Sequence, residues 1–415
     1  MKNTWFIRNS YWFFILLIIA IPAGQASIQI LTVIGYILGI SLLFNSPKIL
    51  INELKKSHYL FCYLMLFLPI GLSLIDSIAP INTVKVLYRA MLYFGIGIIA
   101  ALISVKQNKK MVKIVFYICL FICLDAMTQW IFNVNIFGKN PAINGRVRGV
   151  FGNRYHLSYF IATLSPIIFF YLLSLNVTKK VKLILAFILL LLVTWTVIVG
   201  GARAGIVTLL VSILIFGLYL LKYGYIKNIF IYFSAISIAL VLSVVIAFQT
   251  DAVQERFNLT TKVATNESFL ERFTTKRTQL WRIAVDEIPH YLINGVGARA
   301  YVEIYKQAPV ELKQSRDMNH PHLYFLQLLL ETGVLGLICY LVVCGYLVYK
   351  IYTASAGVEW LMVSFLAMMP INSHVGFYET YWMPLVWAPL GLGLLLSYKA
   401  EQEKRCSNIF ILGKI

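Results

Sequence analysis

Long apolar runs recur along the whole chain, and they constrain its fold more than any other feature. Hydrophobic residues make up 60% of the 415 residues and charged residues only 13%, so most of the surface suits lipid rather than water. A segment inside a bilayer must hydrogen-bond its own backbone, so each apolar run predicts a helix. We expect an all-α polytopic membrane protein with about twelve transmembrane helices, near residues 5–24, 28–44, 58–75, 85–104, 113–133, 155–174, 183–200, 204–222, 228–248, 334–349, 359–372 and 384–398.

The distribution of Lys and Arg predicts the orientation of these helices. If the N-terminus is cytoplasmic, the inside segments hold 19 of the 36 basic residues. The short outside loops at 76–84 and 373–383 hold none. The positive-inside rule therefore places both termini in the cytoplasm of a multi-pass protein. Because the positive-inside pattern accounts for much of the net charge of +19, we expect no nucleic-acid partner.

The first apolar run has two interpretations. Residues 1–10 form a basic segment, residues 11–21 are apolar, and "PAGQA" after them suits a signal peptidase. An uncleaved anchor is favoured because a second apolar run follows at once. Either interpretation leaves the orientation of the later helices unchanged.

The spacing of the runs predicts four parts of the chain. Residues 1–248 hold transmembrane helices 1–9, and 249–320 form a large outer loop domain with two or more helices along the membrane surface. Residues 321–398 hold the C-terminal transmembrane helices, and 399–415 form a cytoplasmic tail. The six cysteines show no spacing typical of a disulfide framework or a metal site.

Arginine is concentrated on the predicted outer side. Only Arg8 and Arg405 are arginine among the 19 inside bases, whereas ten of the 15 outside bases are. From 251 to 317 nine acids nearly balance ten bases, so ion pairing also explains that loop. The segment 138–156 has no acid to balance its bases, which are Lys139, Arg146, Arg148 and Arg154. Because arginine binds phosphate oxygens through two parallel hydrogen bonds, the pattern favours a phosphorylated ligand on the outer side.

Three further arginines are candidates for binding that ligand. Arg203, in "VGGARAGIVTLL", is predicted at a glycine-lined break where a helix begins with free N–H groups. Arg277 lies four residues after Phe273 and four before Trp281, on the predicted apolar side of an amphipathic helix, where a charge needs an anionic partner. Arg89 is one turn into a span, and snorkelling to the interface explains it about as well.

Asp125 is an ionisable residue late in the fifth predicted span. It is expected to face the bundle interior, where it hydrogen-bonds a partner or positions an arginine. A structural role is slightly favoured over a chemical one.

Two histidines, His320 and His322, flank Pro321 directly before an apolar helix. The proline predicts the first turn of that helix, with Asn319 or His320 as the cap and His322 in the first turn. There the helix dipole disfavours imidazolium, so His322 is expected to be neutral and able to accept a proton as a general base. An interfacial histidine bonded to a nearby carbonyl is the alternative. Gly333 and Gly336 permit a bend before the chain crosses the membrane.

The segment "HLYFLQLLLETGVLGL" resembles the histidine-led motif of the O-antigen ligase and polymerase superfamily, in which a histidine precedes an L-Q-x-x-x-E-x-G-x-x-G pattern. Other blocks resemble the family in the same order: "DAMTQWIFNVNIFG", "RVRGVFGN", "GARAG" and "KRTQLWRIAVDEIPHYLINGVGARAY". Together they cover most of residues 120–340. One departure is Leu323, which stands where the family commonly has asparagine.

The resemblance implies a metal-independent, inverting glycosyltransferase of the bacterial inner membrane with its active site on the periplasmic side and no cofactor. Its donor would be a glycan on undecaprenyl diphosphate and its acceptor a sugar of lipid A–core, within the surrounding membrane lipid. Carried over by position, His322 would be the catalytic base, with Arg203 and Arg277 binding the diphosphate. Arg89 is a further diphosphate candidate, and Arg148, Arg154, His320 and Asp125 are expected to contact acceptor or donor.

Three other functions remain open. An O-antigen polymerase would pass the same donor to a second lipid-linked glycan, and a protein O-oligosaccharyltransferase would modify Ser or Thr. The protein-modifying branch generally carries an extra C-terminal portion, whereas this sequence ends about 17 residues after its final predicted span. The length therefore argues against a protein O-oligosaccharyltransferase. A secondary transporter or flippase also has about twelve spans, but the sequence shows no internal repeat and its charges gather at the outer boundary.

Overall fold

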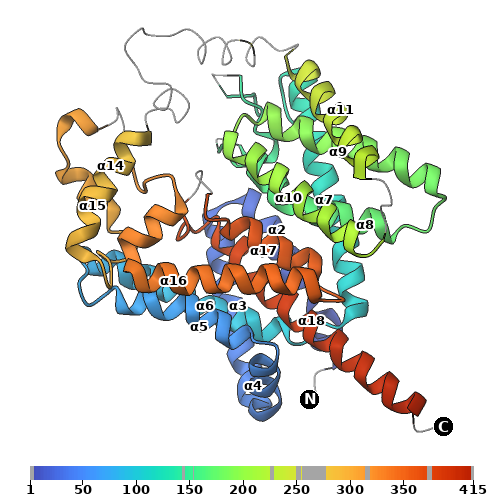
Figure 1. Ribbon diagram of the computed structural model, residues 1–415, viewed down its shortest axis with the longest axis horizontal. Helices are drawn as coiled ribbons and strands as arrows, with labels where there is room; N and C mark the ends of the chain where they lie inside the picture. Colours follow the sequence, from blue (N-terminus) through green and yellow to red (C-terminus); the bar gives the residue numbers. More distant parts are fainter. Residues whose placement is uncertain are drawn as a thin grey trace. The chain divides into compact units, whose positions relative to one another are not determined.

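The computed structural model describes residues 4–142, 145–152, 154–224, 229–248, 254, 277–313, 318–371 and 376–412. Every regular element in these residues is a helix, so the all-α prediction is confirmed (Figure 1). The α-helices are α1 (Thr4–Asn9), α2 (Tyr11–Ala23), α3 (Gln25–Asn45), α4 (Pro47–Lys56), α5 (Tyr59–Leu72), α6 (Pro80–Ala100), α7 (Val105–Phe132), α8 (Leu157–Ser174), α9 (Lys179–Val199), α10 (Arg203–Lys222), α11 (Ile229–Ala247), α14 (Arg277–Glu287), α15 (Tyr301–Gln307), α16 (Tyr324–Thr353), α17 (Val358–Met368) and α18 (Met383–Leu412). Three short 3-10 helices are η1 (Gly149–Phe151), η2 (Ile288–Tyr291) and η3 (Val310–Leu312).

Twelve of these helices correspond one for one to the predicted apolar runs. Eight are long and apolar enough to cross a membrane: α3, α6, α7, α8, α9, α10, α16 and part of α18. Four shorter apolar helices, α2, α5, α11 and α17, account for the remaining runs. The chain is therefore an all-α polytopic membrane protein.

The chain divides into two compact units. Unit 1 comprises residues 1–109 and 268–415, and unit 2 comprises residues 110–267. In unit 1, α6 packs against α3, α5 and α18, while α16 packs against α5 and α17 (Figure 1). In unit 2, α8 packs against α9 and α10, and α9 also packs against α11.

The segments of unit 1 that the charge pattern assigns to the inside lie together at one end. The Gln107 side chain donates to the carbonyl oxygens of Ile7 and Arg8. Lys399 donates to the carbonyl oxygen of Ile103 over 3.1 Å, and Lys350 pairs with Glu401 over 3.0 Å.

The segments assigned to the outside meet one another elsewhere in unit 1. The Ile78 N–H donates to the Val296 carbonyl over 3.1 Å, and the Thr83 hydroxyl lies 3.3 Å from the Ala298 carbonyl. The Phe325 N–H donates to the Pro370 carbonyl over 3.1 Å. Loop segments that the predicted order of spans puts on the same side of a membrane are thus grouped within unit 1.

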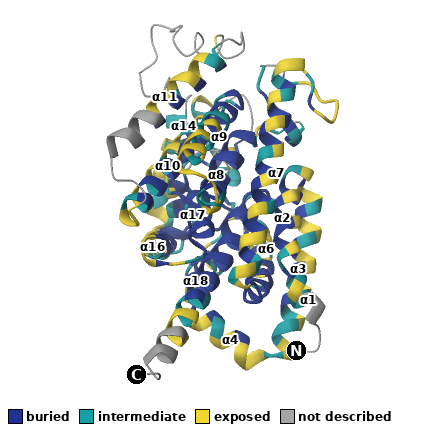
Figure 2. Cartoon of the chain, turned by 90° about the vertical axis from the view of Figure 1, so that its right-hand side faces the viewer, coloured by how far each residue is buried: buried dark blue, intermediate teal, exposed yellow. Residues whose placement is uncertain are grey.

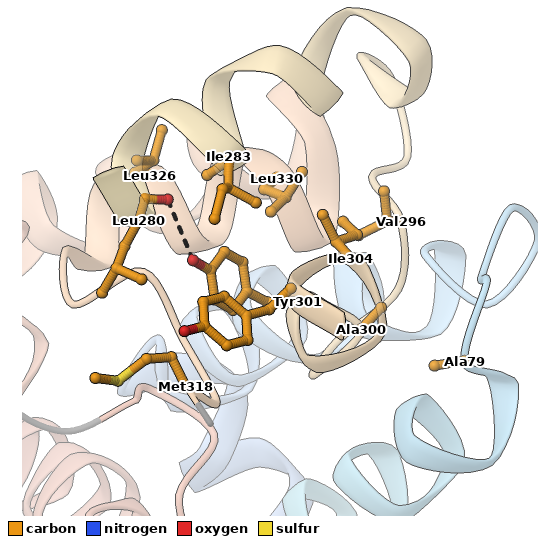
Figure 3. Packing of buried hydrophobic residues seen from close by; sticks show 12 residues of the cluster. Ala79, Leu280, Ile283, Val296, Ala300, Tyr301, Ile304, Met318, Leu326 and Leu330 are labelled. Atoms are coloured by element: carbon orange, nitrogen blue, oxygen red, sulfur yellow. Dashed lines mark hydrogen bonds between the residues drawn. The ribbon is translucent and has the colours of Figure 1, made fainter. Parts of the chain in front are cut away.

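A small helical layer covers the first half of α16. Leu280, Ile283 and Ala284 of α14 and Tyr301 and Ile304 of α15 are buried in one apolar cluster with Leu326 and Leu330 of α16 (Figure 3). The Tyr301 hydroxyl donates to the Leu280 carbonyl over 3.2 Å. This cluster fixes the position of α14, which carries Arg277, against α16.

The α3–α6 contact depends on glycine. A Cβ at Gly95 would overlap the backbone of Tyr36, and a Cβ at Gly39 would overlap the backbone of Gly95. These two glycines let the helix backbones approach more closely than any side chain allows, as is common between membrane helices.

We expect Gly95→Ala to destabilise unit 1 by about 1–3 kcal/mol, because the added methyl group forces α3 away from α6. Gly345→Ala in α16 is the matched control, since a Cβ there meets no atom within 4 Å. Thermal unfolding of the purified proteins in detergent measures both. Equal melting temperatures for the two variants would contradict the α3–α6 contact.

Candidate active site

The two histidines lie in a short loop before α16, and the predicted position of His322 in the first helical turn is wrong. The helix begins at Tyr324 and its N-cap is Leu323, not Asn319 or His320. His322 has a left-handed backbone, with φ of 56°, and Leu323 is extended, so the helix cannot include either residue. The helix dipole therefore gives no reason to expect a neutral His322. The rings of His320 and His322 lie side by side, with centroids 4.1 Å apart.

Helix α14 is anchored to this histidine loop. Trp281 Nε1 donates to the carbonyl oxygen of Pro321 over 3.0 Å. Arg277 lies one turn before Trp281, is half-buried, and is on the same side of α14 as the buried Leu280. The predicted apolar face also included Phe273, which lies outside the described residues. The structure thus brings the Arg277 helix and the His322 loop together within unit 1.

An ion pair lies next to the histidine loop. Arg299 Nη2 and Glu379 Oε1 are 2.9 Å apart, with 26% and 21% of their side chains exposed. A Cβ built on Gly376 would lie 3.3 Å from Glu379 Cγ and 3.5 Å from His320 Cγ, so the glycine separates the two side chains. Arg89 is close enough to Arg299 and Glu379 to interact electrostatically with both. Two arginines, one carboxylate and two imidazoles therefore gather at this end of unit 1.

Gln327 and Glu331 of the predicted motif hold the surrounding segments in place. Glu331 is fully buried and accepts hydrogen bonds from the Gln327 side chain over 3.0 Å and from the backbone N–H groups of Tyr301 and Arg299. The Gln327 Oε1 accepts from the Phe377 N–H over 3.3 Å. The pair thereby links α16 to the segment of Arg299 and to the segment of Glu379.

The bend predicted at Gly333 is confirmed. Gly333 has φ of 66° and ψ of −172°, which breaks α16 one turn and a half after Gln327. A Cβ there would overlap the carbonyl of Ile293, and the Val334 N–H donates to the Leu292 carbonyl over 2.8 Å. The kink gives the 292–297 segment, which ends in the G-x-G turn, room to pack against α16.

The loop after α7 in unit 2 is held by three buried polar side chains. Asp125 Oδ1 accepts from the Ile136 N–H over 2.8 Å, and Gln129 Oε1 accepts from the N–H groups of Arg148 and Gly149. The Asn135 side chain donates to the Gly149 carbonyl over 2.8 Å. The contact of Asp125 with the loop backbone is the structural role that the sequence favoured for it.

Arginines on this loop surround Tyr155. The guanidinium carbons of Arg146 and Arg148 lie 5.0 and 5.3 Å from the centre of the Tyr155 ring, within cation–π range. The Val147 N–H donates to the Val199 carbonyl over 3.3 Å, which fastens the loop to the end of α9.

Arg203 is the first residue of α10 and is exposed, as the break in "GGARAG" predicts. A Cβ on Gly205 would overlap Ser158 of α8, whose hydroxyl accepts from the Ala202 N–H over 3.2 Å. Gly201 has φ of 71°, which turns the chain between α9 and α10. Unit 2 therefore carries Arg203 at a rigid turn beside the start of α8.

His156 precedes the start of α8, and the sequence interpretation did not single it out. Burial, and then the charge of Arg154, lower the pKa of His156 to about 4, and its Nδ1 contacts the Tyr159 hydroxyl. The ring is therefore neutral at pH 7. Arg299 and Glu379 were also missed, because 80 positions separate them and no local pattern relates them.

The structure places the predicted residues in two groups. Unit 1 holds His320, His322, Arg277 and Arg89, and unit 2 holds Arg148, Arg154, Arg203 and Asp125. In the part of the chain that is described, no three His, Cys, Asp or Glu side chains come together in a way that suits a metal ion.

We expect Glu331→Leu to destabilise the protein by about 1–3 kcal/mol for each backbone N–H that loses its acceptor. Glu303→Gln is the control, because Glu303 only forms an exposed pair with Lys306 on α15. Thermal unfolding of both variants measures the difference. A Glu331→Leu protein as stable as the control would contradict the bracing role of this carboxylate.

Residues 185–341 match the family model described as O-antigen ligase. The match runs from α9 through the kink of α16, and includes Arg203, Arg277, Arg299 and both loop histidines. It confirms the resemblance that the motifs indicate. No curated protein matches the chain.

Proposed function

We propose that this chain, a member of the O-antigen ligase superfamily by its match over residues 185–341, joins a glycan from undecaprenyl diphosphate to a sugar hydroxyl of lipid A–core. The reaction takes place on the periplasmic side of the bacterial inner membrane, with both termini in the cytoplasm. The observation that carries the proposal is the gathering of His322, the Arg277 helix and the Arg299–Glu379 pair at one end of unit 1.

His322 acts as the general base in this proposal. It removes the proton from the acceptor hydroxyl while that oxygen attacks the anomeric carbon of the donor sugar. The bond between the anomeric carbon and the diphosphate oxygen breaks on the opposite face, so the configuration inverts. The products are the extended acceptor, undecaprenyl diphosphate and an imidazolium, which returns its proton to water.

Arg203 and Arg277 each bind the donor diphosphate. Their guanidinium groups neutralise the negative charge that grows on the leaving oxygen, which makes diphosphate a better leaving group. Arg203 is at the first position of α10, where the backbone N–H groups that the helix leaves unbonded also favour an anion. Arg148, Arg154 and His320 contact the sugar or phosphate groups of donor and acceptor, and Asp125 holds the loop that carries Arg148.

We expect His322→Ala to lower the transfer rate by about 10²–10⁴-fold, the usual contribution of a general base. His290→Ala is the control, because His290 is an exposed histidine of the same unit on η2. Transfer of a labelled glycan to purified lipid A–core measures both variants. A correctly folded His322→Ala protein with the rate of the control would remove His322 from the mechanism.

We expect Arg277→Glu to abolish donor binding, because the substitution puts a negative charge where the diphosphate is bound. Arg282→Glu is a matched control on the exposed side of the same helix. Arg203→Glu should behave as Arg277→Glu does. Unchanged donor affinity in either of these two variants would withdraw the role of that arginine.

Deletion of the gene separates ligase from polymerase. Loss of all long chains from lipid A–core, with lipid-linked polymer accumulating, indicates a ligase. A surface glycan of a single repeat indicates a polymerase, which uses a second lipid-linked glycan as acceptor. Glycan lost from a protein instead indicates an O-oligosaccharyltransferase.

A further inference from the structure

A cavity of about 370 Å³ lies between α3, α6 and the start of α18 in unit 1. Two basic residues line it, Lys85 and Arg89, which are four positions apart on α6 and therefore on the same side of the helix. The remaining lining residues are Ile28, Gln29, Thr32, Val33, Tyr88, Leu92, Tyr93, Thr380 and Met383, and none of them is acidic.

No acidic residue lines the cavity to balance its two positive charges. Within the described residues neither Lys85 nor Arg89 forms a salt bridge. Glu379, next to the lining residue Thr380, is already paired with Arg299 over 2.9 Å. Arg89 is attracted by Glu379 and repelled by Arg299, so this ion pair offsets little of its charge. Because a half-buried cation in a membrane helix is costly without a partner, the cavity suits an anion.

The position of the cavity indicates that the anion belongs to a lipid. The outward side of α3 is exposed along its length, and the exposed residues include Ile30, Ile34 and Ile37 (Figure 2). In a membrane these residues face acyl chains, so a molecule reaches the cavity from the bilayer. Arg89 is nine residues after Pro80, which places it about 13 Å along α6 at the helical rise. Lys85 and Arg89 both lie in the half of α6 whose end meets the 296–298 segment.

Snorkelling alone does not account for this arrangement. A snorkelling arginine extends to water over its own helix, whereas Arg89 lines a cavity with Thr380 and Met383 from another part of the chain. The hydroxyl of Thr380 and the amide of Gln29 supply additional hydrogen-bond donors on the other walls. Tyr88 and Tyr93 add aromatic rings typical of a membrane interface.

We propose that the Lys85–Arg89 cavity binds the phosphate-bearing head of a lipid that enters from the membrane beside α3. Two sources share this chemistry, an anionic phospholipid and a prenyl diphosphate of the donor type. For the second source the proposal rests on the proposed function, but binding is measured without any transfer, so the two can fail separately.

The test uses the full-length chain in a maltoside detergent, which carries no phosphate. Farnesyl diphosphate and dioctanoyl phosphatidylglycerol are titrated in turn, with farnesol and dioctanoyl glycerol as uncharged probes, and bound lipid is read by native mass spectrometry. We expect Lys85→Gln/Arg89→Gln to weaken binding of at least one charged probe by about tenfold or more, because two charge-assisted hydrogen-bonding groups are lost. Lys55→Gln/Lys56→Gln on α4 removes the same charge from exposed positions at the other end of unit 1 and should leave binding unchanged.

Each outcome decides between the sources or against the site. If the double variant loses binding of farnesyl diphosphate alone, the cavity is assigned to a donor-type lipid. If it loses binding of phosphatidylglycerol alone, the cavity is assigned to a phospholipid, and loss of binding of both probes indicates a general phosphate site. Undiminished binding of both charged probes overturns the proposal, as does an equal loss for the uncharged probes. If the double variant does not fold, Lys85→Gln is measured alone, because substitution of an exposed side chain should leave the fold intact. Arg89→Lys keeps the positive charge and should therefore retain binding.

Discussion

The buried carboxylate of Glu331 is the interaction on which the candidate active site depends. Four stretches of chain meet around it and its partner Gln327: the turn with Arg299, the start of α15, the first half of α16 and the segment at Phe377. A carboxylate without solvent needs several N–H donors, and here they are two backbone N–H groups and the side-chain amide of Gln327. Because these donors come from separate segments, satisfying one buried charge also fixes the relative positions of Arg299, Glu379 and the histidine loop.

The hydrogen bonds of Glu331 and Gln327 connect the segments that surround the short irregular loop of His320 and His322. The histidines lie between the kinked α16 and the Trp281 contact of α14, so their position is set by neighbouring helices rather than by a helix of their own. In unit 2 the same principle applies to arginines: buried amide and carboxylate groups hold the 133–156 loop by its backbone, which leaves Arg146 and Arg148 to interact through their side chains. Both units use buried polar side chains to shape loops that carry charge.

The helices were predictable from sequence, whereas the loops were predictable only in part. Twelve apolar runs became twelve helices because hydrophobic length alone decides whether a segment is helical in a bilayer. The turn at Arg203 and the bend at Gly333 followed from glycines, whose backbone freedom is a local property. The start of α16 was predicted too early because Pro321 suits a first helical turn. The helix begins only at Tyr324, because the backbone of His322 is left-handed and that of Leu323 is extended. The Arg299–Glu379 pair depends on tertiary packing, so no local sequence pattern predicts it.

The proposal that this chain transfers a glycan is tested most directly with purified protein in nanodiscs, where no gradient and no second compartment exist. The donor is a labelled glycan on undecaprenyl diphosphate, and the acceptor is purified lipid A–core. The predicted result is labelled acceptor together with an equal amount of released undecaprenyl diphosphate. A folded protein that binds the donor and leaves its glycosidic diphosphate bond intact, with lipid A–core and with a second lipid-linked glycan alike, would contradict it and favour transport of the lipid instead.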